Sequence, residues 1–218
     1  NKNLILSILL LFTTYSFAGN INKEKPKYLW FDAEANFERF SSKDSISYYL
    51  EKAKDVGFNQ VVVDVKPIYG EVLYKSKILP PLTTVHNKVI ERDWDYLQYF
   101  IDEAHRLGLK VTVSTAVFTA GHPATCEGLV YEDKRWNGKT CLEYMSNNKM
   151  LDIRDDKQKV GAFLNPVRKD VRNFALSIIR EIVKNYDIDA YALDYCRYPA
   201  DNSDFSNETR KAFENYLG

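Results

Sequence analysis

The feature that most constrains the fold is a repeated contrast between short and long connections along the chain. Three amphipathic stretches pass within a few residues into apolar runs, at residues 55–61, 106–111 and 185–190. The segments that follow the first and second of these apolar runs are much longer, residues 68–91 and 119–164. Short helix-to-strand turns and long strand-to-helix loops are typical of a (β/α) barrel, whose active site lies at the long-loop face. This asymmetry therefore predicts an α/β fold of the (β/α)8 TIM-barrel type.

A doubly wound sheet would show the same alternation of helices and strands. It would also be expected to carry a glycine-rich phosphate-binding turn, and no strand here is followed by one. A complete (β/α) barrel needs about 250 residues, and the 218 residues present spend many on loops. We therefore expect about the first four βα units here, with the natural protein continuing beyond Gly218.

Hydrophobic periodicity places the individual elements. Strands are expected at residues 27–31, 61–63, 111–117 and 190–193, and helices at about 42–57, 93–108, 165–185 and 207–218. Asp93 is the expected N-cap of the second helix, and Asn165-Pro166 is the expected start of the third. The last strand is apolar from Ala190 to Leu193, which predicts burial on both faces, as in a parallel sheet.

The first residues read as a targeting segment. Lys2 precedes the apolar run Leu4–Phe12, and Ser16-Phe17-Ala18 forms a small-x-small cleavage site. The run is too short to span a bilayer, and no cysteine follows it directly, so we expect no stable membrane anchor. The predicted organisation is a signal peptide (1–18), a linker (19–26) and the N-terminal part of a barrel (27–218), with export to the periplasm, the cell surface or the medium.

Composition excludes one class of partner. The formal net charge is zero, so no surplus of basic residues is available to neutralise phosphates, and we expect no nucleic-acid binding. The chain is rich in aromatic residues, with 15 Tyr, 12 Phe and 3 Trp. Such side chains can line a sugar-binding cleft, but they also serve as core and its polar margin.

The three cysteines leave at least one thiol unpaired. Cys126 and Cys141 flank one loop-like segment and can form a disulfide, although spacing alone does not establish the bridge geometry. Cys196 lies two residues after Asp194, where a buried structural thiol is favoured over a nucleophile because no histidine is nearby in sequence.

Polar residues follow each predicted strand, and in a barrel they would converge on one rim. They are Asp32, Glu34, Asp64, Lys66, His122, Asp194, Arg197 and Tyr198. Paired carboxylates suit glycoside hydrolysis, in which one carboxylate attacks or orients water and another protonates the leaving oxygen. Asp32, Asp64, His122 and Asp194 also suit a divalent cation, although no tight ligand spacing supports a metal site.

Each of these residues also has a structural interpretation. Asp194 can be an ion-pair partner of Arg197, and Asp32 or Glu34 can simply cap the turn that follows the first strand. Lys66 can be solvated or paired, and His122 lies in Gly-His-Pro, where it can shape the loop.

The fourth predicted strand carries a resemblance to a known family. Asp187-Ile-Asp-Ala-Tyr-Ala-Leu-Asp194-Tyr-Cys-Arg197-Tyr198-Pro199 resembles the fourth-strand signature of the family-10 glycosyl-hydrolase-like proteins. The stretches Gly57–Pro67, Gly70–Ser76 and Phe163–Pro166 are similar to that family's second strand, its loop and the lead into its fourth helix. The resemblance spans Lys27 to the end of the chain.

This resemblance implies a bacterial, exported TIM barrel related to α-amylase-type hydrolases that acts on a glycan without a cofactor. It implies that Asp194 is the nucleophile or stabiliser, kept ionised by Arg197. We expect Arg197 and Tyr198 to orient Asp194, and the substrate-binding residues to include Asp32, Glu34, Asp64, Lys66 and His122. Ala190 departs from the family's usual glycine, and Asp64 from an often uncharged position. The acid/base carboxylate expected from a later strand is absent, so this chain alone is expected to be inactive. The alternatives are a non-catalytic glycan-binding barrel and a metal-dependent hydrolase; the glycan, its linkage, the stereochemical outcome and the oligomeric state are not predicted.

Overall fold

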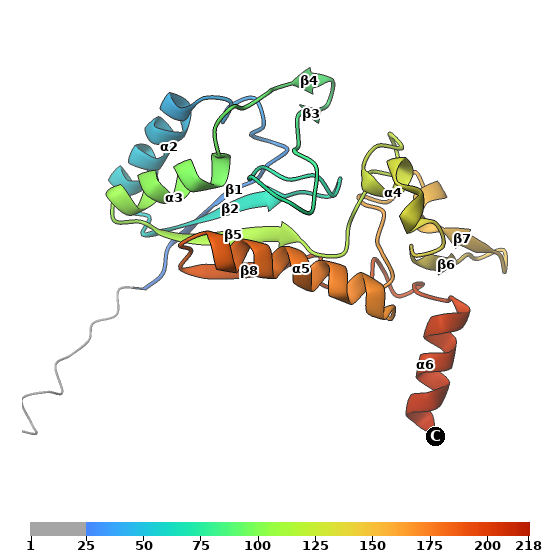
Figure 1. The fold of residues 1–218 in the computed structure, drawn as a ribbon. Helices are drawn as coiled ribbons and strands as arrows, with labels where there is room; N and C mark the ends of the chain where they lie inside the picture. The colour runs from blue at the N-terminus through green and yellow to red at the C-terminus, as the bar shows by residue number, and fades with distance from the viewer. Residues whose placement is uncertain (1–24) are drawn as a thin grey trace, which may run out of the picture.

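The computed structural model describes residues 25–218, which form one four-stranded parallel sheet flanked by helices (Figure 1). Its spatial order is β1 (Tyr28–Phe31), β2 (Gln60–Lys66), β5 (Lys110–Ala116) and β8 (Ala190–Asp194). All three pairings are parallel. The predicted parallel α/β class is therefore confirmed, while the sheet of the described residues is open, with β1 and β8 at its edges. The predicted signal peptide and the linker up to residue 24 lie outside the described residues.

Three long helices connect the strands: α2 (Lys43–Asp55), α3 (Tyr96–Arg106) and α5 (Lys169–Asn185). Each passes through a short turn into β2, β5 or β8, which confirms the predicted asymmetry of the connections. Helix α2 begins after Ser42, whose side chain accepts a hydrogen bond from the Ser45 amide. The N-cap of α3 is Asp95 rather than the predicted Asp93, because Asp95 is the carboxylate that accepts from the Gln98 amide. No helix in the described part of the chain is long and apolar enough to cross a membrane.

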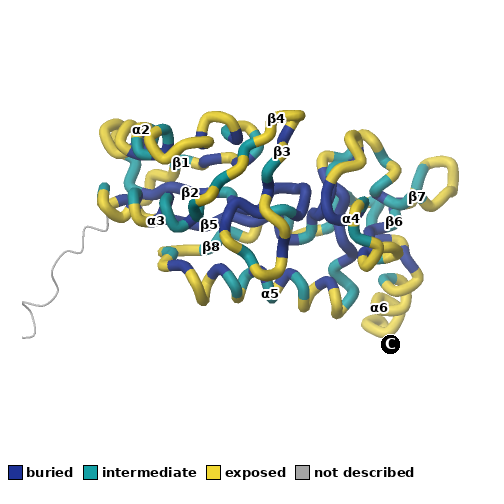
Figure 2. Tube along the Cα trace, turned by 45° about the horizontal axis from the view of Figure 1, so that its top comes forward, coloured by how far each residue is buried: buried dark blue, intermediate teal, exposed yellow. Residues whose placement is uncertain are grey.

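The core lies between the sheet and these three helices. Strands β2 and β5 are central and are buried along almost their whole length, as the dark blue segments of Figure 2 show. Val61, Val63, Val65, Val111 and Val113 of these strands belong to one hydrophobic cluster that includes side chains from all three helices. The helical members include Ile46, Leu50, Leu97, Phe100, Ile101, Ala104, Val171, Ile178 and Ile182. A continuous core of this kind holds the carboxyl ends of the strands in fixed positions.

The two long loops contain short elements that periodicity did not reveal. The first holds the hairpin β3 (Thr84–Val85) and β4 (Lys88–Val89). The second holds α4 (Leu129–Glu132), the antiparallel pair β6 (Leu142–Tyr144) and β7 (Met150–Asp152), and 3-10 turns at residues 134–136 and 153–155. Strands of two or three residues are too short to produce an alternating pattern, so sequence reasoning treated both segments as irregular.

The predicted start of the third helix is wrong by three residues, since the N-cap is Arg168 and not Asn165. Helix α5 begins at Lys169 after Arg168, not at Asn165-Pro166. The Asn165 amide instead donates to Asp204 at 2.6 Å and to Ser206 at 3.1 Å, in the segment that precedes α6 (Asn207–Leu217). Asn165 therefore ties two connections together, a long-range contact that a local cap signal cannot predict.

Strand β8 is not buried on both faces as predicted. Its residues are exposed or half-buried, and Leu193 is 54% exposed. The reason is its position, since β8 pairs only with β5 among the described residues and forms a sheet edge. Helix α6 extends away from the other elements (Figure 1), and none of its residues is buried, as its largely yellow colour in Figure 2 shows.

The cysteines are all free in the described residues. Cys141 is buried and Cys126 exposed, so the candidate disulfide between them is not formed. The Cys126 thiol instead lies 2.7 Å from the Lys157 ammonium, which also donates to the Pro123 carbonyl. Cys196 is exposed, contrary to the expected buried thiol, because the edge position of β8 leaves its C-terminal end open to solvent.

Candidate functional site

A cavity of about 600 Å³ opens at the carboxyl edge of the parallel sheet. Five of the eight predicted site residues line it: Asp32, Glu34, Asp64, His122 and Asp194. Asp32 and Glu34 follow β1, His122 follows β5, Asp64 lies within β2 and Asp194 ends β8, so all four strands of the sheet contribute. The predicted convergence of strand-end residues is therefore observed for these five, in the position where parallel α/β folds bind their ligands.

The strand register explains why the carboxylates meet. Phe31 pairs with Val63, which places Asp32 beside Asp64 one residue further along both strands. On the other side of the sheet, Ala116 pairs with Asp194. The Asp194 carboxylate accepts a hydrogen bond of 2.8 Å from the Tyr195 amide, which holds it at the end of β8.

Burial and mutual repulsion change the acidity of two of these groups. Burial, together with repulsion from the neighbouring Asp32 and Glu34, raises the pKa of Asp64 to about 7, although a backbone hydrogen bond from Ala33 and the nearby Lys66 ammonium act in the opposite direction. Burial also raises the pKa of Glu34, again with a contribution from Asp32, although a backbone hydrogen bond from Ile68 and the nearby His86 oppose the effect. The cavity wall therefore carries carboxyl groups that stay protonated to a higher pH than exposed carboxyl groups do.

The raised pKa of Asp64 predicts a pH-dependent stability difference from the Asp64→Asn variant. A carboxyl whose pKa is raised to about 7 in the folded state contributes stability that is complete below pH 3.8 and is lost as pH rises through 7. The uncharged Asn side chain makes no such pH-dependent contribution. Between pH 4.5 and 7.5, the free energy of unfolding measured with urea should therefore fall for the native protein relative to the variant, by at most about 1.4 kcal/mol per pH unit. Parallel stability curves would contradict the raised pKa.

Three further residues of the polar and aromatic wall were not singled out from the sequence: Trp30, His86 and Tyr195. Trp30 lies two residues before Asp32 and is 48% exposed. Strand alternation could have identified it, because side chains two residues apart share a face. His86 occupies the β3–β4 turn with a positive φ of 48°, and the sequence held no comparable signal for its approach to the cavity.

His122 is held by its ring and by its loop. Its ring stacks on Tyr69, with ring centroids 5.8 Å apart, and its buried Nδ1 has no hydrogen-bond partner in the described part of the chain. Its backbone amide donates to the Glu127 carbonyl at 2.9 Å, which closes the predicted turn. The loop-shaping role and the site position are therefore both present, since His122 also lines the cavity.

Lys66 does not line the cavity. Its side chain is 1% exposed, and its ammonium donates to the carbonyls of Ala116 at 2.5 Å and Thr119 at 2.8 Å. Burial lowers the pKa of Lys66 to about 7, while the nearby Asp64 opposes that shift. The strand register shifts between Asp64 and Lys66, and this β-bulge breaks the alternation on which the prediction rested. Lys66 therefore connects β2 to the end of β5 and to the residues that follow it.

Arg197 and Tyr198 also lie outside the cavity lining. Arg197 donates to the carbonyls of Tyr198 and Pro199, and its guanidinium lies 5.3 Å from the Tyr195 ring centroid. The resemblance had implied a direct electrostatic partner for Asp194, whereas Arg197 here shapes the chain that follows β8. Tyr198 packs against the core, and burial raises its pKa although a hydrogen bond with Thr209 acts in the opposite direction.

The carboxylates and histidines surround the cavity without converging on one point. Among residues 25–218, no group of three or more His, Cys, Asp or Glu side chains is arranged to hold a metal ion. The metal-dependent alternative therefore receives no support from the geometry of the described residues.

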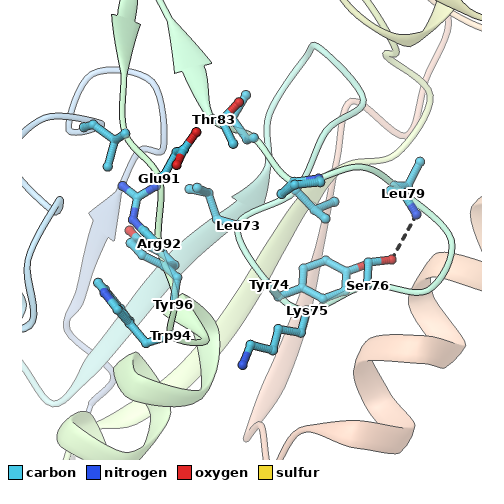
Figure 3. Close-up of a pocket in the computed structure, with 14 residues that line it drawn as sticks. Leu73, Tyr74, Lys75, Ser76, Leu79, Thr83, Glu91, Arg92, Trp94 and Tyr96 are labelled. Atoms are coloured by element: carbon cyan, nitrogen blue, oxygen red, sulfur yellow. Dashed lines mark hydrogen bonds between the residues drawn. The ribbon is translucent and has the colours of Figure 1, made fainter.

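A second cavity, of about 460 Å³, lies between residues 72–83 and 90–96 (Figure 3). Ser76 and Arg92, which line it, form hydrogen bonds within the protein. Ser76 accepts from the Leu79 amide at 3.1 Å, the dashed line in Figure 3, and donates to Glu181 at 2.6 Å. Arg92 donates to the carbonyls of Phe37 and Phe40. This cavity contains none of the predicted site residues, and its contacts indicate a structural role for the loop.

Comparison with known proteins agrees with the resemblance seen in the sequence. The family described as Glycosyl hydrolase-like 10 matches residues 27–218. The chain is 35% identical over 204 residues to an S-layer-related protein of Niallia circulans, covering 89% of this chain and 12% of that protein. It is 28% identical over 149 residues to the glycosyl hydrolase DigH of Escherichia coli K12, covering 66% of this chain and 32% of DigH.

The solved structures extend the likeness to the fold. The α-L-fucosidase isoenzyme 2 from Paenibacillus thiaminolyticus matches with a TM-score of 0.58 at 19% identity, over 88% of this chain and 26% of that one. The chain thus spans about a third of DigH and about an eighth of the S-layer-related protein. Because the family match covers nearly all the described residues, the chain belongs to the glycosyl hydrolase-like 10 family.

Proposed function

We propose that this chain provides a glycan-binding site of a glycoside hydrolase-like protein, and that Asp194 acts at the anomeric carbon as nucleophile or stabiliser. The observation that carries the proposal is the cavity at the carboxyl edge of the sheet, which is lined by Asp194 together with Asp32, Glu34 and Asp64. Glycoside hydrolysis needs one ionised carboxylate at the anomeric carbon and one protonated carboxyl at the leaving oxygen. Membership of a glycosyl hydrolase-like family supports the same reaction class.

Asp64 is the described residue that best fits the second role. A general acid works best when its pKa lies near the working pH, and burial raises the pKa of Asp64 to about 7. Its position on β2 beside Asp32 brings it to the cavity wall. A carboxyl from a later strand, as the family resemblance implies, is the alternative donor.

Aromatic side chains support a sugar ligand in particular. Trp30 and Tyr195 line the cavity from β1 and from the end of β8, on opposite edges of the sheet. Trp30 remains 48% exposed, so a large flat face is available to pack against the apolar side of a sugar ring. Carboxylates and exposed aromatic rings together suit a carbohydrate better than a fully apolar ligand.

The variant Trp30→Ala should bind glycan about tenfold more weakly than the native protein, because it loses the stacking face. Tyr28→Ala is the matched control, since Tyr28 lies on the same strand, is 52% exposed and does not line the cavity. Both variants would be titrated calorimetrically with the oligosaccharide that the native protein binds best in a panel of bacterial and plant glycans. Equal losses in the two variants, or no binding by the native protein, would refute the proposed site.

The open sheet supports a larger barrel in the whole protein. The outer edge of β8 and the surface of α6 are exposed, with Leu193 at 54% and Tyr216 at 85%. Further βα units that pair with β8 would cover this edge and extend the sheet toward a (β/α)8 barrel. The same proposal includes export, which rests on residues 1–18 of the sequence. A non-catalytic glycan-binding barrel would use the same cavity and would bind glycans without cleaving them.

A further inference from the structure

The ionisable side chains that line the cavity at the carboxyl edge of the sheet are mainly acidic. Four of its lining side chains are carboxylic acids, namely Asp32, Glu34, Asp64 and Asp194. None of the described residues that line it is a lysine or an arginine, and the only lining groups that can become cationic are His86 and His122. The buried ammonium of Lys66 lies outside the lining and is bound to two carbonyls, although its charge still lowers the pKa of Asp64.

The carboxyl groups also repel one another. Asp32 raises the pKa of both Glu34 and Asp64, and Glu34 adds to the effect on Asp64. A cation placed among them would remove part of this repulsion, whereas an anion would add to it. The cavity therefore discriminates between ligands by their charge.

A metal ion does not match this arrangement. A divalent cation needs several oxygen or nitrogen ligands directed at one point, and no such group exists among residues 25–218. The volume of about 600 Å³ and the exposed face of Trp30 suit a larger organic ligand whose positive charge is carried on one substituent. A sugar ring with a free amine has this form.

We propose that the site selects amino sugars with a free, protonated amine, such as glucosamine units, over neutral sugars and rejects uronic acids. The proposal rests on the proposed function, because it names the substrate class of the same cavity. The ammonium group lies among the carboxylates, with Glu34 as its principal partner, while Trp30 packs against the ring. Glu34 lies two residues beyond Asp32, on the loop that follows β1, so it reaches the cavity without taking the place of Asp194.

The test compares matched pairs of short oligosaccharides by titration calorimetry. Glucosamine and glucose oligomers of equal length, in β-1,4 and in β-1,6 linkage, are titrated into the native protein, with a glucuronate oligomer as the anionic probe. In low salt the glucosamine oligomer of at least one pair should bind about tenfold more tightly than its glucose partner, and glucuronate should not bind. The preference should shrink in about 0.5 M salt, where exposed charges are screened.

The variant Glu34→Gln should lose most of the preference, because the affinity for the glucosamine oligomer falls more than the affinity for its glucose partner. Glu38→Gln is the control, because Glu38 is exposed, pairs with Lys88 and does not line the cavity. Equal binding within every pair, or a preference that Glu34→Gln leaves intact, overturns the amino-sugar inference alone. Binding of glucuronate overturns it as well. Failure of every oligomer to bind overturns the proposed function together with this inference.

Discussion

Replacing Asp194 by asparagine in the full-length protein should lower kcat/KM on its glycan substrate by at least about a thousandfold. The amide cannot attack the anomeric carbon and cannot stabilise the positive charge that develops there. Its oxygen can still accept the hydrogen bond from the Tyr195 amide, so the end of β8 should keep its conformation. Reducing-end release and calorimetric binding would be measured on the same preparation. Binding should survive while turnover is lost.

The control for this substitution is Asp201→Asn. Asp201 is exposed, follows the same strand and does not line the cavity. Its variant should keep native turnover. If Asp194→Asn also keeps native turnover, Asp194 has no part in the mechanism. If the native full-length protein binds glycans but cleaves none, the non-catalytic alternative is the correct description.

Replacing Lys159 by methionine should destabilise the fold by about 3–5 kcal/mol. The Lys159 ammonium lies 2.7 Å from the Glu143 carboxylate, whose side chain is fully buried in β6. Among residues 25–218, the second oxygen of this carboxylate, Oε2, is buried without a hydrogen-bond partner, and the first accepts one hydrogen bond, from the Ser203 hydroxyl. Without Lys159, the charge of Glu143 would be left almost uncompensated in the interior. Urea unfolding near pH 7 would measure the loss.

Two comparisons separate this effect from the simple loss of a lysine. The double variant Glu143→Gln/Lys159→Met removes both charges and should recover much of the stability, because no buried charge remains unpaired. Lys88→Met breaks the exposed pair between Lys88 and Glu38 and should cost less than about 1 kcal/mol. A loss of similar size in Lys88→Met and Lys159→Met would show that burial of the Glu143 pair is not the cause.

The predicted site illustrates which parts of a local pattern survive folding. Asp32, Asp64 and Asp194 each directly follow a strand predicted from the sequence, and parallel strands end at the same edge of a sheet. Their meeting therefore required only the strand assignments and the parallel order, both of which the pattern of short and long connections supplied. Lys66 met the same criterion but lies elsewhere, because the bulge between Asp64 and Lys66 reverses the expected alternation. Nothing in the residue types of this strand signals that bulge.

Long-range contacts decided the remaining differences. Asn165 has the composition of a helix cap, yet its amide binds Asp204, 39 positions later in the chain. His86 reaches the cavity only through the fold of a long loop whose strands contain two residues each. Such interactions depend on which segments pack together, so hydrophobic periodicity carries no information about them.

The parallel α/β class, the asymmetry of the connections and the carboxylates at the strand ends can be predicted from the residues, because these features follow from local periodicity and from the direction of the chain. The exposed edge at β8, the binding of Lys66 to two carbonyls, and the places of Trp30 and Tyr195 in the cavity wall depend on contacts between distant segments. Burial is a property of the neighbours that a segment acquires. The same apolar run from Ala190 to Leu193 can therefore be a central strand or an edge strand, depending on what pairs with it.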